Sequence, residues 1–344
     1  MQKRIIKIKD LKPGMISGNE IVHKNKILIT EGVIITPNTI DKLKNIYSLY
    51  EVEIYTTDKE VQELIKLEEA KETVNKLTNN IENVFNSTSV KSSNTLEVNK
   101  YAKELLENLK INNSIFKNII LHGSGEDCIF KHSVNVGALS YLLGKWLNFN
   151  EDKLQSLVYS ALLHDYGKTK INKDLLNKTT PLSKKELDII RKHTVEAYNE
   201  IKEVPFIPKS TLFSILMHHE RCDGSGYPLG LKGDQIHEFA KIIAITDTFD
   251  ALSSNRVYKN KKGPLEILKI LKEESLSKLD FSITTKFLEG ISNFYIGQEA
   301  ILNNGDICKI IKFDFNHISS PLILCKDDFI ELNKENSIYI TQLL

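Results

Sequence analysis

The chain has 344 residues, a formal net charge of +1 and 26% charged residues. This length can bury the cores of two or three domains, and the nearly neutral charge argues against a nucleic acid polymer as partner. The four cysteines form no CxxC pair, the N-terminus lacks the apolar core of a signal peptide, and no apolar run approaches the ~18 residues of a membrane span. We therefore expect a cytoplasmic protein that does not enter a membrane and has no disulfide framework.

Residues 1–57 are expected to form a small β-rich domain, because short apolar runs alternate with turn residues such as Pro13-Gly14. Thr36 is a candidate N-cap and precedes Pro37, which predicts that a helix begins there. Residues 52–55 would then form a closing strand. No cluster of catalytic residue types lies in this part of the chain.

Residues 58–94 are highly charged and have the pattern of a helical linker. Apolar residues spaced four and three apart outline the seam of a short coiled coil, formed by Ala70, Val74, Leu77, Ile81 and Val84. Two interpretations stay open: a homodimer through residues 58–110, or an amphipathic helix packed on its own chain. The Ser- and Asn-rich stretch 86–94 predicts a flexible joint.

Residues 95–290 predict a run of helices whose apolar faces also carry metal-binding residue types. Seven such positions stand out: His132, His164, Asp165, His193, His218, His219 and Asp247. A polar side chain on the core face of a helix is costly unless something binds it. One core histidine would usually be a hydrogen-bonded structural residue, whereas seven such residues on five helices indicate a single site.

The side chains at these positions favour a dinuclear metal centre, since neutral imidazole binds first-row transition metals and a carboxylate can bridge two of them. We predict Asp165 as the bridge, with one ion near His132, His164 and Asp247 and the other near His193, His218 and His219. Two cations held in this way can hydrolyse a phosphate ester by in-line displacement. Lys168, one turn beyond Asp165, is placed to reach a phosphate oxygen, although it also fits an ordinary helix C-terminal charge.

Residues 291–344 change to short apolar runs separated by polar turns such as the one at residues 303–305. We predict strands within residues 300–302, 308–313, 322–324, 329–332 and 337–341. They would form a small β-barrel or a β-meander.

Two motifs resemble the HD-GYP family of the HD phosphohydrolase superfamily: HDYGK at residues 164–168 and MHHERCDGSGYP at residues 217–228. The resemblance runs from about residue 125 to 290 and continues through residues 229–233, 247–252 and 256–259. It implies a mainly α fold, an HD-type helical bundle to which small β-rich N-terminal and C-terminal appendages are added. It also implies two divalent transition-metal ions (Fe, Mn, Zn or Co) and hydrolysis of a cyclic dinucleotide, chiefly cyclic di-GMP, to linear pGpG and GMP.

Carried over position by position, the family's metal-binding roles fall on the same seven residues. The resemblance further implies catalytic roles for Asp165 and Lys168, and substrate-binding roles for Lys168, Arg256, Lys259 and Tyr227. Glu220 and Asp250 are candidates to hold metal-bound histidines through their second ring nitrogen.

Two positions depart from the family pattern. Relatives with a third metal carry a glutamate four residues before the first histidine, where this chain has Cys128, so we expect two ions. A position that is often aromatic in relatives is Cys222 here.

Two alternatives to this function stay open. The protein could bind a cyclic dinucleotide as a weakly catalytic sensor, or it could act on a mixed cyclic dinucleotide or another nucleotide. The intact set of ligand residues favours hydrolysis over pure sensing.

Overall fold

The computed structural model describes residues 2–343 apart from 12–14, 24–25, 48–50, 57, 87–91, 125–127, 255–262, 315–316, 319, 327 and 333–337. By its internal contacts the chain forms two compact units, Met1–Thr73 and Val74–Leu344, and the division falls within the long helix α2 (Asp58–Asn86). In the described part of the chain, no helix combines the length and apolarity needed to span a bilayer.

The first unit combines short antiparallel strands with one helix. β1 (Gln2–Lys7), β5 (Glu51–Thr56) and β2 (Ile16–Ser17) form a sheet in the order β1-β5-β2, and β3 (Ile21–His23) pairs with β4 (Lys26–Ile29). A short 3-10 helix, η1 (Ile8–Asp10), follows β1, and α1 (Pro37–Tyr47) precedes β5.

Local sequence signals account for these elements. Thr36 Oγ1 accepts a hydrogen bond from the Thr39 N–H at 3.2 Å, so the predicted N-cap and the helix that begins at Pro37 are confirmed. The predicted strand at residues 52–55 is confirmed as part of β5. The expected turn at residues 13–14 lies outside the described residues.

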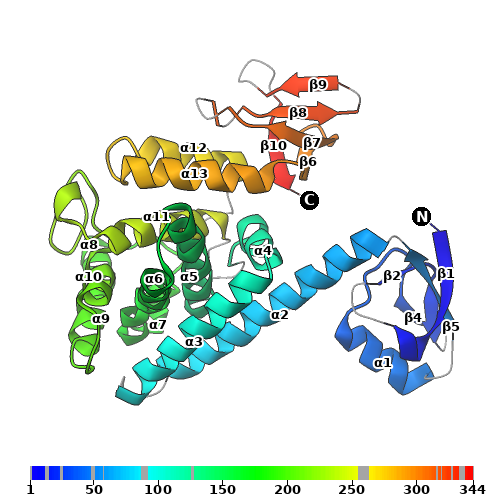
Figure 1. Ribbon diagram of the computed structural model, residues 1–344, viewed down its shortest axis with the longest axis horizontal. Coiled ribbons are helices and arrows are strands. Elements are labelled where there is room, and N and C mark those ends of the chain that lie inside the picture. The colour runs from blue at the N-terminus through cyan, green and yellow to red at the C-terminus, as the bar shows by residue number, and fades with distance from the viewer. Residues whose placement is uncertain are drawn as a thin grey trace. The chain divides into compact units, whose positions relative to one another are not determined.

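The second unit is a helical bundle that carries a small sheet. After α2 it contains α3 (Ser92–Ile111), α4 (Ser114–His122), α5 (Ile129–Trp146), α6 (Glu151–Leu163), η2 (Tyr166–Lys170), α7 (Lys173–Leu176), α8 (Lys184–Arg191), α9 (His193–Ile201), α10 (Lys209–Met217), η3 (Gly233–Gln235), α11 (Glu238–Ser253), α12 (Pro264–Glu274) and α13 (Phe281–Tyr295). α5 contacts both α6 and α11, and every residue from His132 to Gly144 is buried, so α5 is the central helix (Figure 1).

The C-terminal strands form an antiparallel five-stranded sheet in the order β10-β6-β7-β8-β9. These strands are β6 (Glu299–Leu302), β7 (Ile307–Lys312), β8 (Leu322–Cys325), β9 (Asp328–Glu331) and β10 (Ile340–Leu343). β6 to β9 form a meander, one of the two predicted forms, and β10 departs from it by returning beside β6. The last strand begins at Ile340, later than the start of the predicted segment 337–341, and continues to Leu343. The predicted mainly α class is confirmed.

The apolar stripe of α2 is covered within this chain. Leu77, Ile81 and Val84 are buried, and Lys76 Nζ lies 2.7 Å from Glu104 Oε1 of α3. This arrangement corresponds to the interpretation of α2 as an amphipathic helix packed on its own chain, while homodimerisation through residues 58–110 stays a prediction. Residues 87–91 of the expected flexible joint lie outside the described residues.

Candidate metal centre

Five helices and the turns that follow them bring the seven candidate ligands together. They are His132 in α5, His164 and Asp165 directly after α6, His193 at the start of α9, His218 and His219 directly after α10, and Asp247 in α11. Six are buried, and the side chain of the seventh, His219, is 16% exposed to solvent. Residues up to 115 positions apart in the sequence are therefore in contact in one interior site.

The turn after α6 places Asp165 beside His193. Asp165 leaves the helix with φ −99° and ψ 6°, and η2 then packs closely on α9. A Cβ at Gly167 would lie 1.9 Å from the carbonyl oxygen of His193, so only glycine permits this approach. In the motif HDYGK, Gly167 therefore allows the close approach that positions the ligand Asp165.

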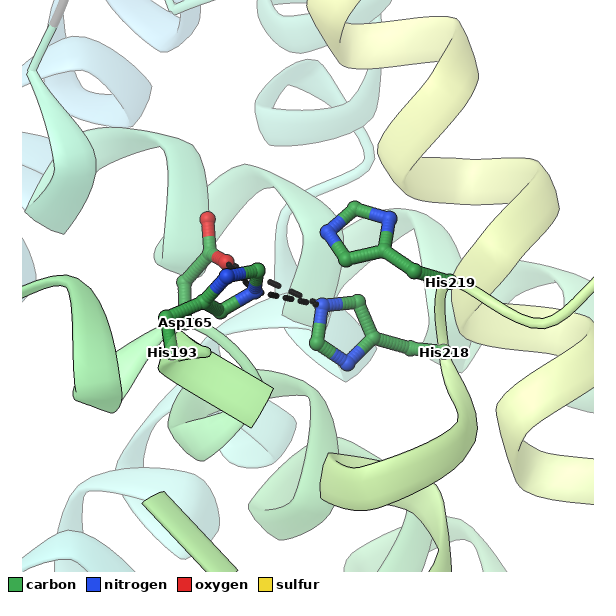
Figure 2. Close-up of side chains that lie close together, drawn as sticks. All are labelled: Asp165, His193, His218 and His219. Carbon is green, nitrogen blue, oxygen red and sulfur yellow. Dashed lines mark hydrogen bonds and ion pairs between the residues drawn. The ribbon is translucent and has the colours of Figure 1, made fainter. Parts of the chain in front are cut away.

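The two carboxylate oxygens of Asp165 face different histidines. Oδ2 lies 3.4 Å from His164 Nε2 and 3.7 Å from His132 Nε2. Oδ1 lies 3.4 Å from His193 Nε2 and 3.7 Å from His218 Nε2, and Figure 2 shows these side chains pointing toward one another. This division is the one that a carboxylate bridging two cations would need.

The donor atoms form two clusters that share Asp165. One contains His132, His164 and Asp165, the other contains Asp165, His193, His218 and His219, and in each cluster the donor atoms lie within 4.8 Å of one another. Asp247 links the clusters, because its Oδ1 lies 3.0 Å from His132 Nε2 and its Oδ2 lies 4.0 Å from His219 Nδ1. Neither cluster formed by the described residues includes Cys128, which is half-buried nearby in a pocket wall.

Backbone carbonyls orient three of the imidazoles. The Nδ1–H of His164, His193 and His218 donates to the carbonyl oxygen three residues earlier, at 2.7, 2.8 and 2.8 Å respectively. The Nε2 lone pair of each ring is consequently free to face the site, which is the tautomer that a metal ligand needs.

Asp250 orients the fourth imidazole, as the sequence predicted. The Nδ1–H of His132 donates to Asp250 Oδ2 at 2.7 Å. Asp250 also accepts hydrogen bonds from Asn135 Nδ2 at 2.8 Å and from Ser124 Oγ at 3.0 Å. Asn135 and Ser124 were not predicted. Asn135 lies one turn after His132 among the apolar residues of α5, and this spacing could have marked it as part of the site.

The corresponding prediction for Glu220 is wrong. Its buried carboxylate accepts the backbone N–H groups of Leu229 and Leu231 at 2.7 and 2.9 Å, and no imidazole is among its partners in the described part of the chain. Glu220 therefore holds the loop that follows the histidine pair. A Cβ at Gly226 would lie 2.3 Å from the backbone nitrogen of Arg221, so this glycine is required for close packing. Gly224 is required for a different reason, because its φ of +84° lies in the region that favours glycine.

Burial and charge set the protonation of the histidines. Burial lowers the pKa of His132, but hydrogen bonds with Asp247 and Asp250 outweigh burial and raise the pKa to about 9. The surroundings of His132 thus favour a positive charge on its ring, and a metal ion can supply that charge in place of a proton. Burial lowers the pKa of His193 to about 3, so its imidazole is neutral at pH 7 and its lone pair is available.

Lys168 lies next to the shared carboxylate. Its Nζ is 2.5 Å from Asp165 Oδ2. Burial raises the pKa of the Asp165 carboxyl, but the charges of Lys168 and His164 outweigh burial and hold it well below its usual range. Asp165 is therefore ionised, as metal binding requires.

Two buried atoms of the candidate ligands have no hydrogen-bond partner among the described residues: His164 Nε2 and Asp165 Oδ1. Buried polar atoms without a partner are rare because their desolvation is not compensated. A cation between the imidazoles and the carboxylate would satisfy both. Imidazole nitrogens with carboxylate oxygens are a donor set that suits Fe, Mn, Zn or Co, so these residues fit a metal.

Of the remaining predicted substrate residues, the structure describes Tyr227. The ring of Tyr227 stacks on His219 with 4.7 Å between ring centroids, and the Arg191 guanidinium lies 5.3 Å from the centroid of Tyr227. Arg256 and Lys259 lie outside the described residues.

A pocket of about 470 Å³ opens beside the clusters, and its lining includes His132, Asp165 and Lys168. Glu82 and Asn86 of α2 also line it. No sequence pattern marks these two residues, because only the packing of α2 on the bundle brings them to the pocket.

Residues 109–283, about half of the chain, match the HD domain family. The chain belongs to this family. The predicted resemblance to HD-GYP proteins is confirmed, since the matched segment contains all seven candidate ligands and the curated relatives below are named as phosphodiesterases of cyclic dinucleotides.

Three relatives illustrate the similarity. Cyclic di-GMP phosphodiesterase PA4108 of Pseudomonas aeruginosa is 26% identical over 200 residues, which cover 58% of this chain and 48% of the relative. The 3'3'-cGAMP-specific phosphodiesterase 1 of Vibrio cholerae is 32% identical over 167 residues, which cover 48% of this chain and 38% of the relative. The solved structure of Bd1817, a HDG"Y"P protein from Bdellovibrio bacteriovorus, has a TM-score of 0.53 at 18% identity and covers 85% of this chain and 99% of that one.

The structural likeness supports the HD-type fold alone. The chain spans about half the length, or less, of the two curated relatives. Their activities are therefore a basis for a proposal about this protein.

Proposed function

We propose that this protein is a metal-dependent phosphodiesterase that hydrolyses a cyclic dinucleotide, chiefly cyclic di-GMP, to linear pGpG, with GMP as the product of any second cleavage. The observation that carries the proposal is the position of Asp165, whose two oxygens face two separate sets of imidazoles. The names of the relatives support the reaction class, since one acts on cyclic di-GMP and another on 3'3'-cGAMP.

The proposed cofactor is a pair of divalent transition-metal ions, Fe, Mn, Zn or Co. Asp165 would bridge them, with His132, His164 and Asp247 on one ion and His193, His218 and His219 on the other. When bound, such a pair supplies Lewis acidity and an activated water for in-line displacement at phosphorus. The buried, preoriented rings support this assignment, because their Nδ1 atoms are already hydrogen-bonded away from the site.

Lys168 is the proposed catalytic cation of the chain itself. Its side chain is 20% exposed to solvent and lines the pocket, so the ammonium group can contact a phosphate oxygen while it pairs with Asp165. A fixed positive charge in a largely buried site stabilises the charge that develops on the phosphate oxygens. Lys173 lines the same pocket and adds attraction for an anionic dinucleotide.

Fewer observations support the proposed substrate-binding roles of Tyr227, Arg256 and Lys259. Tyr227 covers His219 and would exclude water from that side of the site or contact the substrate. Arg256 and Lys259 are proposed as substrate-binding residues from the family motif alone. The cytoplasmic location stays a prediction.

The direct test incubates purified, metal-loaded protein with cyclic di-GMP or 3'3'-cGAMP and separates the products by chromatography. We expect linear dinucleotide with wild-type protein. Asp165→Ala should lose both bound metal and hydrolysis while its far-ultraviolet circular dichroism stays helical, and the exposed Asp41→Ala should behave as wild type. Tight nucleotide binding by fully metal-loaded protein without any product would support the sensor alternative instead.

A further inference from the structure

One part of the pocket wall comes from outside the segment that matches the HD domain family. α2 ends at Asn86, whereas the match begins at residue 109. Yet Glu82 and Asn86 of α2 line the same pocket as His132 and Lys168. Since these two residues are one helical turn apart, they lie on one face of α2 and approach the pocket together.

Glu82 is a carboxylate that the metal centre does not use. Among the described residues, two carboxylates line the pocket, and one of them, Asp165, is paired with Lys168 and faces the histidines. Glu82 is half-buried and forms no hydrogen bond or ion pair with any residue that the structure describes. A partly buried carboxylate needs N–H or O–H donors, and it repels phosphate groups. Its fitting partner in an anionic nucleotide is therefore a base that presents donors.

The turn of α2 that carries Glu82 is fixed beside the catalytic residues. Phe85 packs edge-on against Tyr166, with 5.1 Å between ring centroids, and Tyr166 directly follows Asp165. Phe85 also packs against Phe130 at 5.9 Å, and Phe130 itself lines the pocket. The pocket consequently offers an aromatic surface on which a base can stack, next to a carboxylate held in a defined place.

We propose that Glu82 selects guanine in the dinucleotide and that Asn86 assists it; this inference rests on the proposed function and names the base that the site prefers. The Watson–Crick edge of guanine presents two donors, N1–H and the 2-amino group, beside the acceptor O6. Glu82 accepts from both donors, and the amide of Asn86 donates to O6. Adenine places the N1 lone pair opposite the carboxylate, so the charge of Glu82 opposes its binding.

The test compares cyclic di-GMP with cyclic di-AMP in two measurements on the full chain. Calorimetry on metal-stripped protein gives the ratio of the two dissociation constants without turnover, and metal-loaded protein gives the ratio of the two kcat/KM values. Wild-type protein should prefer cyclic di-GMP by about 10- to 100-fold in each ratio, the range expected for one bidentate base contact. Glu82→Gln should bring both ratios to within about 3-fold, because a neutral amide accepts one hydrogen bond and can donate to adenine N1.

The matched control is Glu72→Gln, which makes the same change at an exposed position of the same helix and should keep both ratios. An unchanged ratio in Glu82→Gln, or no base preference in wild-type protein, would overturn the inference. Guanine-selective binding that depends on Glu82, without hydrolysis by metal-loaded protein, would support it and contradict the proposed function alone. Hydrolysis of both dinucleotides at equal rates would contradict this inference alone, and the absence of both binding and hydrolysis would overturn both.

Discussion

The Nδ1 atom of His132 lies 2.7 Å from Oδ2 of Asp250, which is one helical turn beyond Asp247 on α11. Asp247 Oδ1 lies 3.0 Å from Nε2 of the same ring. One helix thus holds both nitrogens of an imidazole that a different helix provides. A carboxylate on the outer nitrogen fixes the tautomer and makes the inner nitrogen a stronger donor.

We predict that Asp250→Asn lowers the affinity for metal by about 10- to 100-fold and lowers activity with it. The amide keeps the size of the side chain but removes the charge, so the His132 ring is a weaker ligand and its Nε2 can carry the proton instead. Competition with a chelator measures the metal affinity, and the exposed Asp234→Asn provides the control. Unchanged metal affinity in Asp250→Asn would show that the ring does not depend on this carboxylate.

Gly167→Ala should damage the site through packing. The new Cβ would lie 1.9 Å from the His193 carbonyl oxygen, so η2 and α9 must move apart and separate Asp165 from His193. We expect a loss of about 2–3 kcal/mol in the free energy of unfolding, the upper range for an overpacked position. Gly263→Ala is the matched control, because its Cβ would meet no atom of the described residues closer than 3.6 Å. Equal melting temperatures for the two variants would contradict this prediction.

Helical spacing explains how much of the site the sequence could predict. Asp247 and Asp250 are three residues apart, so a helix places both on one face, and their common approach to His132 follows. The His218-His219 pair is different, since adjacent residues on a helix point about 100° apart. Both can reach the site because α10 ends at Met217 and the two histidines lie in the turn beyond it.

Contacts that depend on how distant segments fold back could not be predicted in the same way. Glu220 follows a ligand pair and looked like a partner for an imidazole, but the loop returns nine and eleven residues later and brings two N–H groups to it. Glu82 lies between apolar positions of a charged helix, and nothing in the sequence distinguishes it from a solvent-exposed residue. Its place in the pocket follows from the packing of Phe85 on Tyr166.

An ion pair outside the metal centre gives a pH-dependent prediction. Hydrogen bonds from Lys178, at 2.7 and 2.8 Å, and from the Ser183 backbone lower the pKa of Glu186 from 4.5 to about 2. Because the folded pKa is depressed, this contribution to stability is present above pH 4.5 and is lost as the pH falls toward 2. A carboxyl titration by NMR should give the low pKa in wild-type protein and a higher pKa in Lys178→Met, still below 4.5 because the Ser183 hydrogen bond remains. The exposed Lys184→Met should leave it low.

Removal of metal should destabilise the helical bundle selectively. A chelator would leave His164 Nε2 and Asp165 Oδ1 buried without hydrogen-bond partners among the described residues. The Asp165 and Asp247 charges would then be balanced only by Lys168 and His132. A ligand present at 100 times its dissociation constant stabilises the folded state by about 2.7 kcal/mol. For a domain of this size, chelation should then lower the melting temperature by about 5–10 °C.

The first compact unit supplies an internal control for this experiment, because none of the seven candidate ligands lies in residues 1–73. Hydrogen exchange should quicken in α5 and α11 when metal is removed and should stay unchanged in α1. Asp165→Ala should show no further change on chelation, since it has already lost the shared ligand. A uniform loss of protection across both units, or a melting temperature that does not respond to chelation in wild-type protein, would mean that the seven residues do not form a metal site.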